Sequence, residues 1–152
     1  MKAKRLIVST DGGSRGNPGP AGAGAVITDE HGVTLTELKK SLGTMTNNEA
    51  EYEAVLLGLT ALPRLLNGKA ELKNYSIEVR LDSELIARQL SGIYQIKEAR
   101  LYPYFIKIWN MQVKDYPKIL FTHVPREKNT RADSLANSAM DEACLPDRQA
   151  GV

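Results

Sequence analysis

The start of the chain contains three segments with strand character, and the connections between them are short. Residues 5–10, 23–28 and about 33–42 are rich in β-branched and apolar side chains. Parallel neighbours would need a crossover of about a dozen residues or more, usually a helix. Only the turn at 29–32 separates the second segment from the third, and the run Gly12–Pro20, which is expected to break regular structure, separates the first two. The spacing predicts an antiparallel meander of three strands.

The rest of the chain alternates between helix and strand. Thr46 and Glu49 match the capping box that begins many helices, and Pro63 is expected to end or kink this first helix. Further strands are predicted at 76–81 and 118–124, and further helices at 83–90, 99–114 and 130–143. The order β-β-β-α-β-α-α-β-α predicts an α/β fold in which helices flank one five-stranded mixed sheet. We expect the domain to span 1–144 and a C-terminal tail to occupy 145–152.

Composition limits the class of protein. A chain of 152 residues with 42% hydrophobic and 25% charged residues has the length and composition of one ordinary globular domain. Its longest nearly apolar stretch, 54–62, is too short to cross a bilayer, and no signal peptide is expected. The net charge of +2 is compatible with nucleic acid without indicating it. The single cysteine, Cys144, favours a reducing, cytoplasmic setting.

Glu51 has an unusual position in the predicted first helix. At about 100° per residue it falls inside the apolar arc of that helix, whereas Glu49 and Glu53 fall on the polar side. A carboxylate that faces the core needs a partner, because burying an unpaired charge is costly. Two interpretations stay open for Glu51: an acid paired with a lysine at the rim of the core, or a functional group.

Three aspartates occupy positions that could reflect either a functional site or ordinary stabilisation of a helix end. Asp11 and Asp82 each follow the C-terminal end of a predicted strand, where open α/β sheets bind ligands. Asp82 could instead cap the helix that begins beside Ser83. Asp133 lies in the first turn of the last predicted helix, where an acid could simply compensate the helix dipole. The position of a single aspartate therefore does not decide between a functional and a structural role.

Together, the four acids indicate a metal site. Two strand ends and two helix starts can converge at one end of a sheet, and clustered carboxylates repel one another unless cations are present. Oxygen ligands without a histidine or cysteine cluster select Mg²⁺ or Mn²⁺ over zinc. Two such ions are the usual device for in-line displacement at phosphorus, so the set indicates metal-assisted phosphodiester hydrolysis.

Four blocks of sequence also carry a resemblance that covers roughly residues 5–143. They are Ser9–Gly22, Thr46–Tyr52, Leu81–Ser83 and Asn129–Ala136. In this order they resemble the type 1 ribonuclease H family, in a bacterial or archaeal form without a basic protrusion. The element order derived above matches the fold of that family.

The resemblance implies an endonuclease that cleaves the RNA strand of RNA–DNA hybrids and leaves 5′-phosphate and 3′-hydroxyl ends. It implies two Mg²⁺ or Mn²⁺ ions, both bridged by Asp11. Glu51 and Asp82 are expected to complete the coordination of the ion near the leaving 3′-oxygen. Asp133 is expected to help hold the ion that activates the attacking water. The hybrid duplex is the implied partner, with no membrane and no obligate protein partner expected.

The predicted substrate contacts lie in the glycine-rich run and at the start of the first helix. Glycines let the backbone approach the minor groove of a hybrid, where 2′-hydroxyls are exposed, although such a run can also be a plain surface loop. Amides suit hydroxyls and base edges, and a helix N-terminus suits a phosphate. The expected contacts are Gly12, Gly13, Ser14, Gly16, Asn17, Thr46, Asn47 and Asn48. Phosphates could be neutralised by Lys39, Lys40, Arg126, Lys128 and Arg131, which could equally be solvated surface residues.

Two segments depart from the family pattern. The segment 91–100 is too short for the basic protrusion that helps some members hold the hybrid. The loop 125–128 is also too short for the mobile histidine loop of other members. Arg126 and His123 compete for that role. We favour Arg126 as a charge contact to the substrate phosphate, because His123 shares strand parity with Phe121 and is expected to face the packed layer.

Two other functions stay open at this point. One is a catalytically weak or idle nucleic-acid-binding module with the same fold. The other is a two-metal nuclease that acts on DNA or on double-stranded RNA. The intact acidic set argues against the idle module, because clustered carboxylates without a function would only destabilise the fold.

Overall fold

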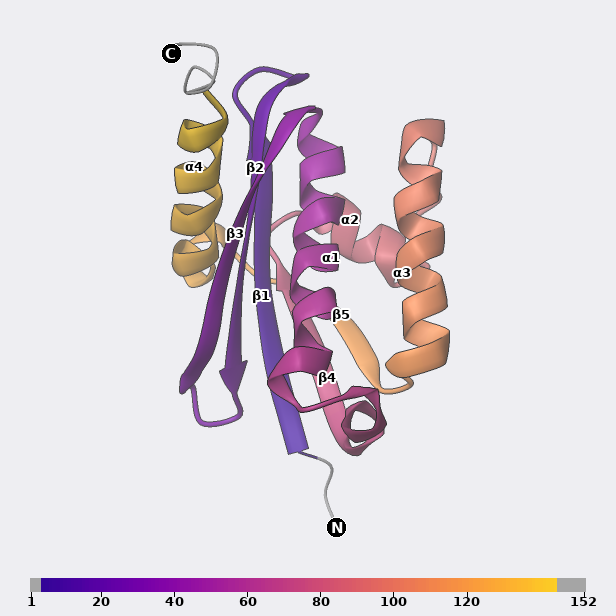
Figure 1. Cartoon of the computed structure of the whole chain (residues 1–152). Helices are drawn as coiled ribbons and strands as arrows, with labels where there is room; N and C mark the ends of the chain where they lie inside the picture. Colours follow the sequence, from indigo (N-terminus) through magenta and orange to yellow (C-terminus); the bar gives the residue numbers. More distant parts are fainter. Residues whose placement is uncertain (1–3, 145–152) are drawn as a thin grey trace.

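The computed structural model describes residues 4–144, except for the side chain of residue 69, and it consists of one sheet with helices on both faces (Figure 1). The strands are β1 (Lys4–Ser14), β2 (Gly19–Asp29), β3 (Thr34–Met45), β4 (Tyr75–Leu81) and β5 (Ile119–His123). The helices are α1 (Asn47–Leu65), α2 (Glu84–Leu90), α3 (Tyr102–Asp115) and α4 (Thr130–Cys144), with short 3-10 helices η1 (Lys69–Asn74), η2 (Ala99–Leu101) and η3 (Arg126–Lys128). This order confirms the predicted alternation. The predicted tail at 145–152 lies outside the described residues, and the domain bounds stay a prediction.

The sheet is mixed, as expected. Its strand order is β3-β2-β1-β4-β5. β1, β2 and β3 form an antiparallel meander, whereas β4 and β5 run parallel to β1. In Figure 1, α4 covers the meander on one face, and α1, α2 and α3 lie on the other. The two parallel crossovers bring the ends of β1 and β4 to the same edge of the sheet.

The glycine-rich run is mostly strand, which differs from the expected loop. β1 continues to Ser14, with Gly12 opposite Ala23 in the neighbouring strand, and only 15–18 form the turn. A Cβ atom at Gly12 would lie 2.1 Å from the carbonyl oxygen of Ala50 in α1. Glycine therefore allows α1 to lie directly on β1, an approach that sequence reasoning along one strand does not reveal.

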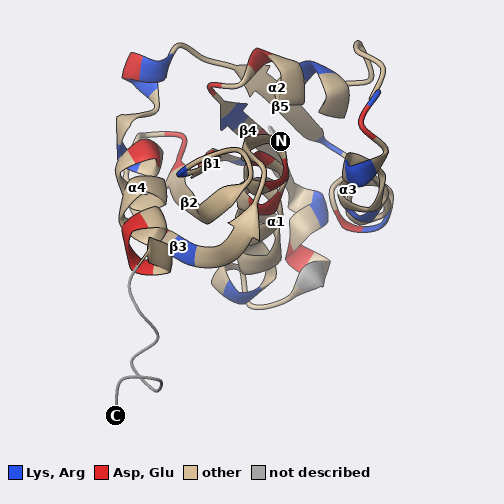
Figure 2. Ribbon diagram, turned by 90° about the horizontal axis from the view of Figure 1, so that it is seen from above, with Lys and Arg blue, Asp and Glu red and all other residues tan. Residues whose placement is uncertain are grey.

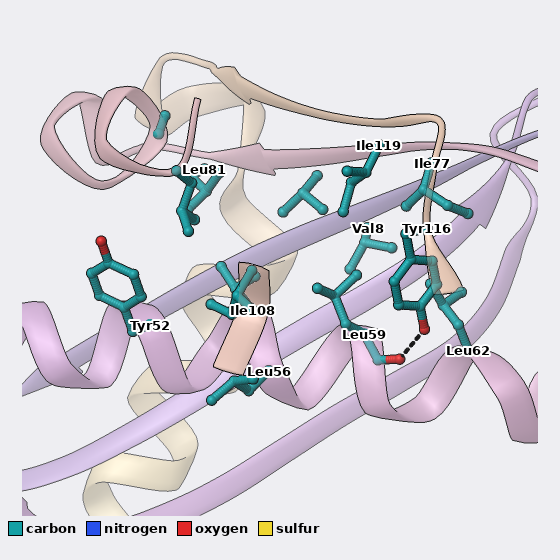
Figure 3. Packing of buried hydrophobic residues seen from close by; sticks show 14 of the residues in the cluster. Val8, Tyr52, Leu56, Leu59, Leu62, Ile77, Leu81, Ile108, Tyr116 and Ile119 are labelled. Atoms are coloured by element: carbon teal, nitrogen blue, oxygen red, sulfur yellow. Dashed lines mark hydrogen bonds between the residues drawn. The ribbon is translucent and has the colours of Figure 1, made fainter. Parts of the chain in front are cut away.

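The capping box at the start of α1 is confirmed. The Thr46 hydroxyl accepts from the backbone N–H of Glu49, and the Glu49 carboxylate accepts from the N–H of Thr46 at 3.2 Å. Pro63 is expected to end or kink the helix; α1 does not end there but continues to Leu65. Proline has no N–H to give to the carbonyl of Leu59, one helical turn earlier. Figure 3 shows what replaces it: the hydroxyl of Tyr116 donates to that carbonyl.

This hydrogen bond leads to a stability prediction. Tyr116→Phe should lower the free energy of unfolding by about 1–3 kcal/mol, because it leaves the buried Leu59 carbonyl without a donor. In a Pro63→Ala background the same change should cost clearly less, since the new alanine N–H can pair with that carbonyl. Urea unfolding of the four proteins in this cycle measures both costs. Equal costs in the two backgrounds would show that the tyrosine does not compensate for the proline.

The main core lies between the sheet and the layer formed by α1, α2 and α3 (Figure 3). Tyr52 of α1 is fully buried there, and its hydroxyl donates to the side chain of Gln89 in α2 at 2.8 Å. This contact fixes the start of α1 against α2, close to the strand ends that carry the acids. Within residues 4–144, no helix is long and apolar enough to cross a membrane.

Candidate active site

The register of the parallel strands brings two of the predicted acids together. The last residues paired between β1 and β4 are Thr10 and Leu81. Asp11 and Asp82 follow them directly, so the two aspartates lie side by side where β1 and β4 separate. Asp82 is not the cap of α2: that position belongs to Ser83, whose hydroxyl accepts from the N–H of Ile86 at 3.3 Å. The capping interpretation of Asp82 is therefore wrong.

Glu51 joins these aspartates from α1. One carboxylate oxygen each of Asp11, Glu51 and Asp82 lies within 4.8 Å of the others. The Oε2 atom of Glu51 is buried and has no hydrogen-bond partner within the described structure. A lysine at the rim of the core does not satisfy it, so the structural interpretation of Glu51 is not supported.

Asp133 approaches the same cluster from the first turn of α4. It is half-buried, and its carboxyl group hydrogen-bonds to that of Asp11. All four predicted acids therefore meet at one edge of the sheet, contributed by β1, α1, the end of β4 and α4.

Burial and mutual repulsion make this cluster unfavourable in its fully ionised form. Burial, then the charge of Asp82 and the hydrogen bond with Asp133, raise the pKa of Asp11 to about 8. Burial, then the charges of Asp11 and Asp82, raise the pKa of Glu51 well above its ordinary value, and Arg126 opposes that rise. Without a cation, the cluster retains protons at neutral pH.

The stability of the metal-free protein should therefore decrease as pH rises from about 4 to about 8. The Asp11 carboxyl ionises near 3.8 in the unfolded chain and near 8 in the folded one. Between these values the folded state binds more protons, and stability falls with pH wherever that holds. Urea unfolding in a chelator across this range measures the decrease. Asp11→Asn should flatten the profile; a wild-type profile without this slope would contradict the assigned environment of Asp11.

The donor set fits a hard divalent cation. It consists of carboxylate oxygens, one of them the buried and unpartnered Oε2 of Glu51, and the cluster contains no histidine or cysteine. Such oxygen-only sets suit Mg²⁺ and Mn²⁺, whereas zinc sites usually contain nitrogen or sulfur ligands. A bound cation would also remove the repulsion that the raised pKa values reflect.

Beside this cluster, the turn after β1 is fastened to the start of α1. The backbone N–H of Ser14 donates to Oδ1 of Asn47 at 2.9 Å. The N–H of Asn47 in turn donates to Oδ1 of Asn17 at 3.0 Å. These bonds gather most of the predicted substrate residues into one surface. Gly12 is not part of that surface, because it is buried under α1.

Comparison with known proteins decides the family. The family model described as "Reverse transcriptase-like" matches residues 9–139. A bifunctional protein from Mycobacterium tuberculosis is 40% identical over 91% of this chain, and the chain spans only 36% of the length of that relative. A protein from Hydrogenovibrio crunogenus named "Ribonuclease H" is 32% identical, over 88% of this chain and 93% of its own length. This chain belongs to the ribonuclease H family.

Solved structures agree with this assignment. LC11-RNase H1, isolated from compost, has 48% sequence identity and a TM-score of 0.87, over 95% of this chain and all of its own. The same protein in complex with an RNA/DNA hybrid has 49% identity and a TM-score of 0.86, over 92% of this chain and 99% of its own. The type 1 ribonuclease H family and the fold predicted from the sequence are both confirmed.

Two residues of this chain beside the cluster are candidates for the role of the family's mobile histidine. The Nε atom of Arg126 lies 4.0 Å from Oδ2 of Asp82, and its side chain is 85% exposed. The register places His123 opposite Leu81 at the end of β5. His123 is exposed, so the expectation that it faces the packed layer is wrong. The alternating burial of β5 stops at Thr122, which is half-buried like Phe121, so strand parity does not predict the exposure of His123.

The basic residues of the described chain do not form a single basic face. Figure 2 shows acidic and basic residues interspersed around the molecule. Lys39 donates to Glu142, and Arg131 donates to Glu37, so two of the predicted phosphate-neutralising residues are already paired with acids. Binding of a polyanion would therefore depend on local contacts near the cluster more than on a general basic surface.

Asn129 is a site residue that sequence reasoning missed. It is buried, and its Nδ2 atom donates to the carbonyl of Thr10 at 2.8 Å, while its Oδ1 atom is buried without a partner. This bond fastens β1, just before Asp11, to the residue that precedes α4 and Asp133. An asparagine directly before a helix looks like an ordinary cap in sequence, which hides this connection.

Proposed function

We propose that this chain is a ribonuclease H that hydrolyses the RNA strand of RNA–DNA hybrids, leaving 5′-phosphate and 3′-hydroxyl ends. The observation that carries the proposal is the convergence of three carboxylates around a buried, unpartnered oxygen of Glu51. The similarity to a ribonuclease H1 whose structure is a complex with an RNA/DNA hybrid supports the substrate class. Because the chain spans only part of some relatives, the proposal concerns the activity of this domain.

Two ions, Mg²⁺ or Mn²⁺, are the proposed cofactors. Asp11 lies close to Glu51 and Asp82 and interacts with Asp133, so it would be shared by both ions. Glu51 and Asp82 would complete the coordination of one ion, and Asp133 would help to hold the other. When bound, such ions neutralise charge on the phosphate and lower the pKa of a bound water. The backbone positions of the four side chains are set by β1, by the end of β4 and by the first turns of the packed helices α1 and α4.

The proposed substrate contacts are the residues gathered beside this cluster. They are Gly13, Ser14, Gly16, Asn17, Thr46, Asn47 and Asn48, together with Arg126 on the other side. Backbone groups and amides can read the 2′-hydroxyls of the RNA strand, and the start of α1 favours a phosphate of the DNA strand. Arg126 would supply a positive charge near the reacting phosphate, and a guanidinium acts there by its charge and not by proton transfer.

Arg126→Ala should slow cleavage about tenfold or more, because it removes a positive charge that stabilises the phosphate in the transition state. Arg126→Lys should recover part of the rate. His123→Ala, at an exposed strand end, should leave the free energy of unfolding within about 0.5 kcal/mol of wild type. Initial rates with a labelled hybrid and urea unfolding provide the measurements.

The pH–rate profile separates the two residues further. With Arg126 in this role, the wild-type profile should contain no step that disappears in His123→Ala. If His123→Ala folds normally but loses turnover, and Arg126→Ala does not, the role belongs to His123.

The reaction itself is tested by cleavage of an end-labelled hybrid with and without divalent ions. We expect cleavage only when Mg²⁺ or Mn²⁺ is present, and fragments that a ligase can rejoin on a complementary strand, because they carry 3′-hydroxyl and 5′-phosphate ends. Cleavage in a chelator, or cyclic phosphate ends, would exclude the proposed chemistry. Binding of the hybrid without any cleavage would favour an idle module.

We also propose the cytoplasm as the place of action. Cys144 is the one cysteine of the sequence, and it is exposed and unpaired. An exposed free thiol suits a reducing compartment.

A further inference from the structure

A polar cleft of about 440 Å³ lies beside the start of α1. Its lining residues come from the turn after β1, the start of α1 and the segment that leads into η2: Asn17, Pro18, Thr46, Asn48, Glu98, Ala99 and Arg100. Three of these residues, Asn17, Thr46 and Asn48, belong to the proposed substrate contacts. Glu98 is the one acid among the described residues that line the cleft.

Glu98 accepts a hydrogen bond from the side-chain amide of Asn48, a group that the substrate would otherwise contact. The Nδ2 atom of Asn48 donates to Oε1 of Glu98 at 3.0 Å. Asn48 lies in the first turn of α1, where the partial positive charge of the helix favours an anion. A carboxylate held there by a charge-assisted hydrogen bond keeps the Asn48 amide from the RNA strand and repels a DNA-strand phosphate at the start of α1.

The other charges in this region are fixed by their own contacts. Arg100 lies with Nη1 3.9 Å from Oε1 of Glu49. Glu49 is held by the capping box with Thr46 and by the hydroxyl of Tyr104, which donates to Oε2 at 3.2 Å. Glu49 therefore cannot move into the cleft without breaking these bonds. Glu98 is exposed and is held in the described structure by the amide of Asn48, so it is the acid that can leave.

We propose that Glu98 is an internal competitor of the substrate backbone, which weakens binding of the hybrid by occupying Asn48 and by opposing the charge of Arg100. The inference rests on the proposed function, because the ligand displaced is a phosphodiester of the hybrid. A phosphate that enters the cleft must displace the carboxylate and approach its negative charge. Glu98 thereby sets the affinity for the hybrid and favours release of the duplex.

The inference predicts that removing Glu98 strengthens binding. Glu98→Gln removes the charge and keeps an acceptor for Asn48, whereas Glu98→Ala removes both. At low salt the dissociation constant for a fluorescent RNA–DNA hybrid, measured in EDTA so that no cleavage occurs, should fall about threefold in Glu98→Gln and further in Glu98→Ala. The gain should shrink as salt is added, because part of it is electrostatic.

Two controls separate this local effect from a general gain of charge. Glu30→Ala changes the net charge equally in the β2–β3 turn, at the opposite end of the sheet, and should improve binding much less. A hybrid whose DNA strand carries uncharged methylphosphonate linkages should abolish the advantage of Glu98→Gln and should reduce that of Glu98→Ala to the part that comes from freeing the Asn48 amide. Thermal unfolding checks that both variants are folded, and Glu98→Gln serves as the test if Glu98→Ala is not.

Unchanged or weaker binding by the folded Glu98 variants would overturn the inference. An equal gain in Glu30→Ala, or a gain of Glu98→Gln that persists in full with the uncharged DNA strand, would overturn it as well. If wild type cleaves the hybrid while the Glu98 variants show no gain, only the role of Glu98 is rejected. If wild type neither binds nor cleaves the hybrid, the proposed function is rejected together with it.

Discussion

Asp11→Asn should abolish cleavage of an RNA–DNA hybrid while the chain stays folded. Asp11 lies close to Glu51 and Asp82 and also interacts with Asp133, so in the proposed arrangement the amide would remove a ligand from both ions. Loss of such a bridging ligand is expected to cost several kcal/mol in the transition state, which corresponds to a rate loss of about 100-fold or more. Initial cleavage rates with Mg²⁺ or Mn²⁺, over a range of ion concentrations, measure the loss.

Stability provides a second measurement on the same variant. Removing one charge from a repelling cluster should raise the free energy of unfolding of the metal-free protein above pH 8, because the Asp11 carboxyl is then ionised in the wild type. Glu30→Gln removes one negative charge far from the cluster and serves as the matched control. Retention of more than about a tenth of the wild-type rate in folded Asp11→Asn would contradict the bridging role.

Replacing a few ribonucleotides near a cleavage position with deoxyribonucleotides should block cutting at that position. The proposed contacts from Gly13, Asn17 and Asn48 can distinguish RNA from DNA only through the 2′-hydroxyls of the strand that is cut. Without these hydroxyls the strand loses the hydrogen bonds that position it over the cluster. Electrophoresis of end-labelled fragments measures cutting at each position.

Unmodified positions of the same strand give the internal control. Cutting should continue there at the wild-type rate, which excludes a general loss of binding. Equal cutting at the deoxyribonucleotides would show that the 2′-hydroxyl is not read, and it would favour a nuclease that also acts on DNA.

Much of the fold could be predicted because its determinants are local. The capping box at Thr46 depends on two residues three positions apart, and the meander depends on turns too short for a crossover. The acids could be located for a similar reason: Asp11 and Asp82 follow paired strand residues, and the position of Glu51 follows from helical periodicity. Convergence of the four acids required only that the strand ends meet at one edge of the sheet.

The errors depend on contacts between residues that are distant in sequence. The extension of β1 through Gly12 depends on the close approach of Ala50, and the continuation of α1 past Pro63 depends on the hydroxyl of Tyr116. The bond between Asn129 and the end of β1 joins residues more than a hundred positions apart. Periodicity within one segment contains no information about such partners.

A panel of duplexes offered to the wild-type protein at equal concentration tests the proposed function most directly. It consists of an RNA–DNA hybrid, a double-stranded RNA and a double-stranded DNA of one sequence, each labelled on either strand, with Mg²⁺ or Mn²⁺ and with a chelator. We predict divalent-ion-dependent cleavage of the RNA strand of the hybrid, with the DNA strand intact and both other duplexes uncut or cut far more slowly. Cleavage of double-stranded DNA or double-stranded RNA at the rate of the hybrid would contradict the proposed ribonuclease H function.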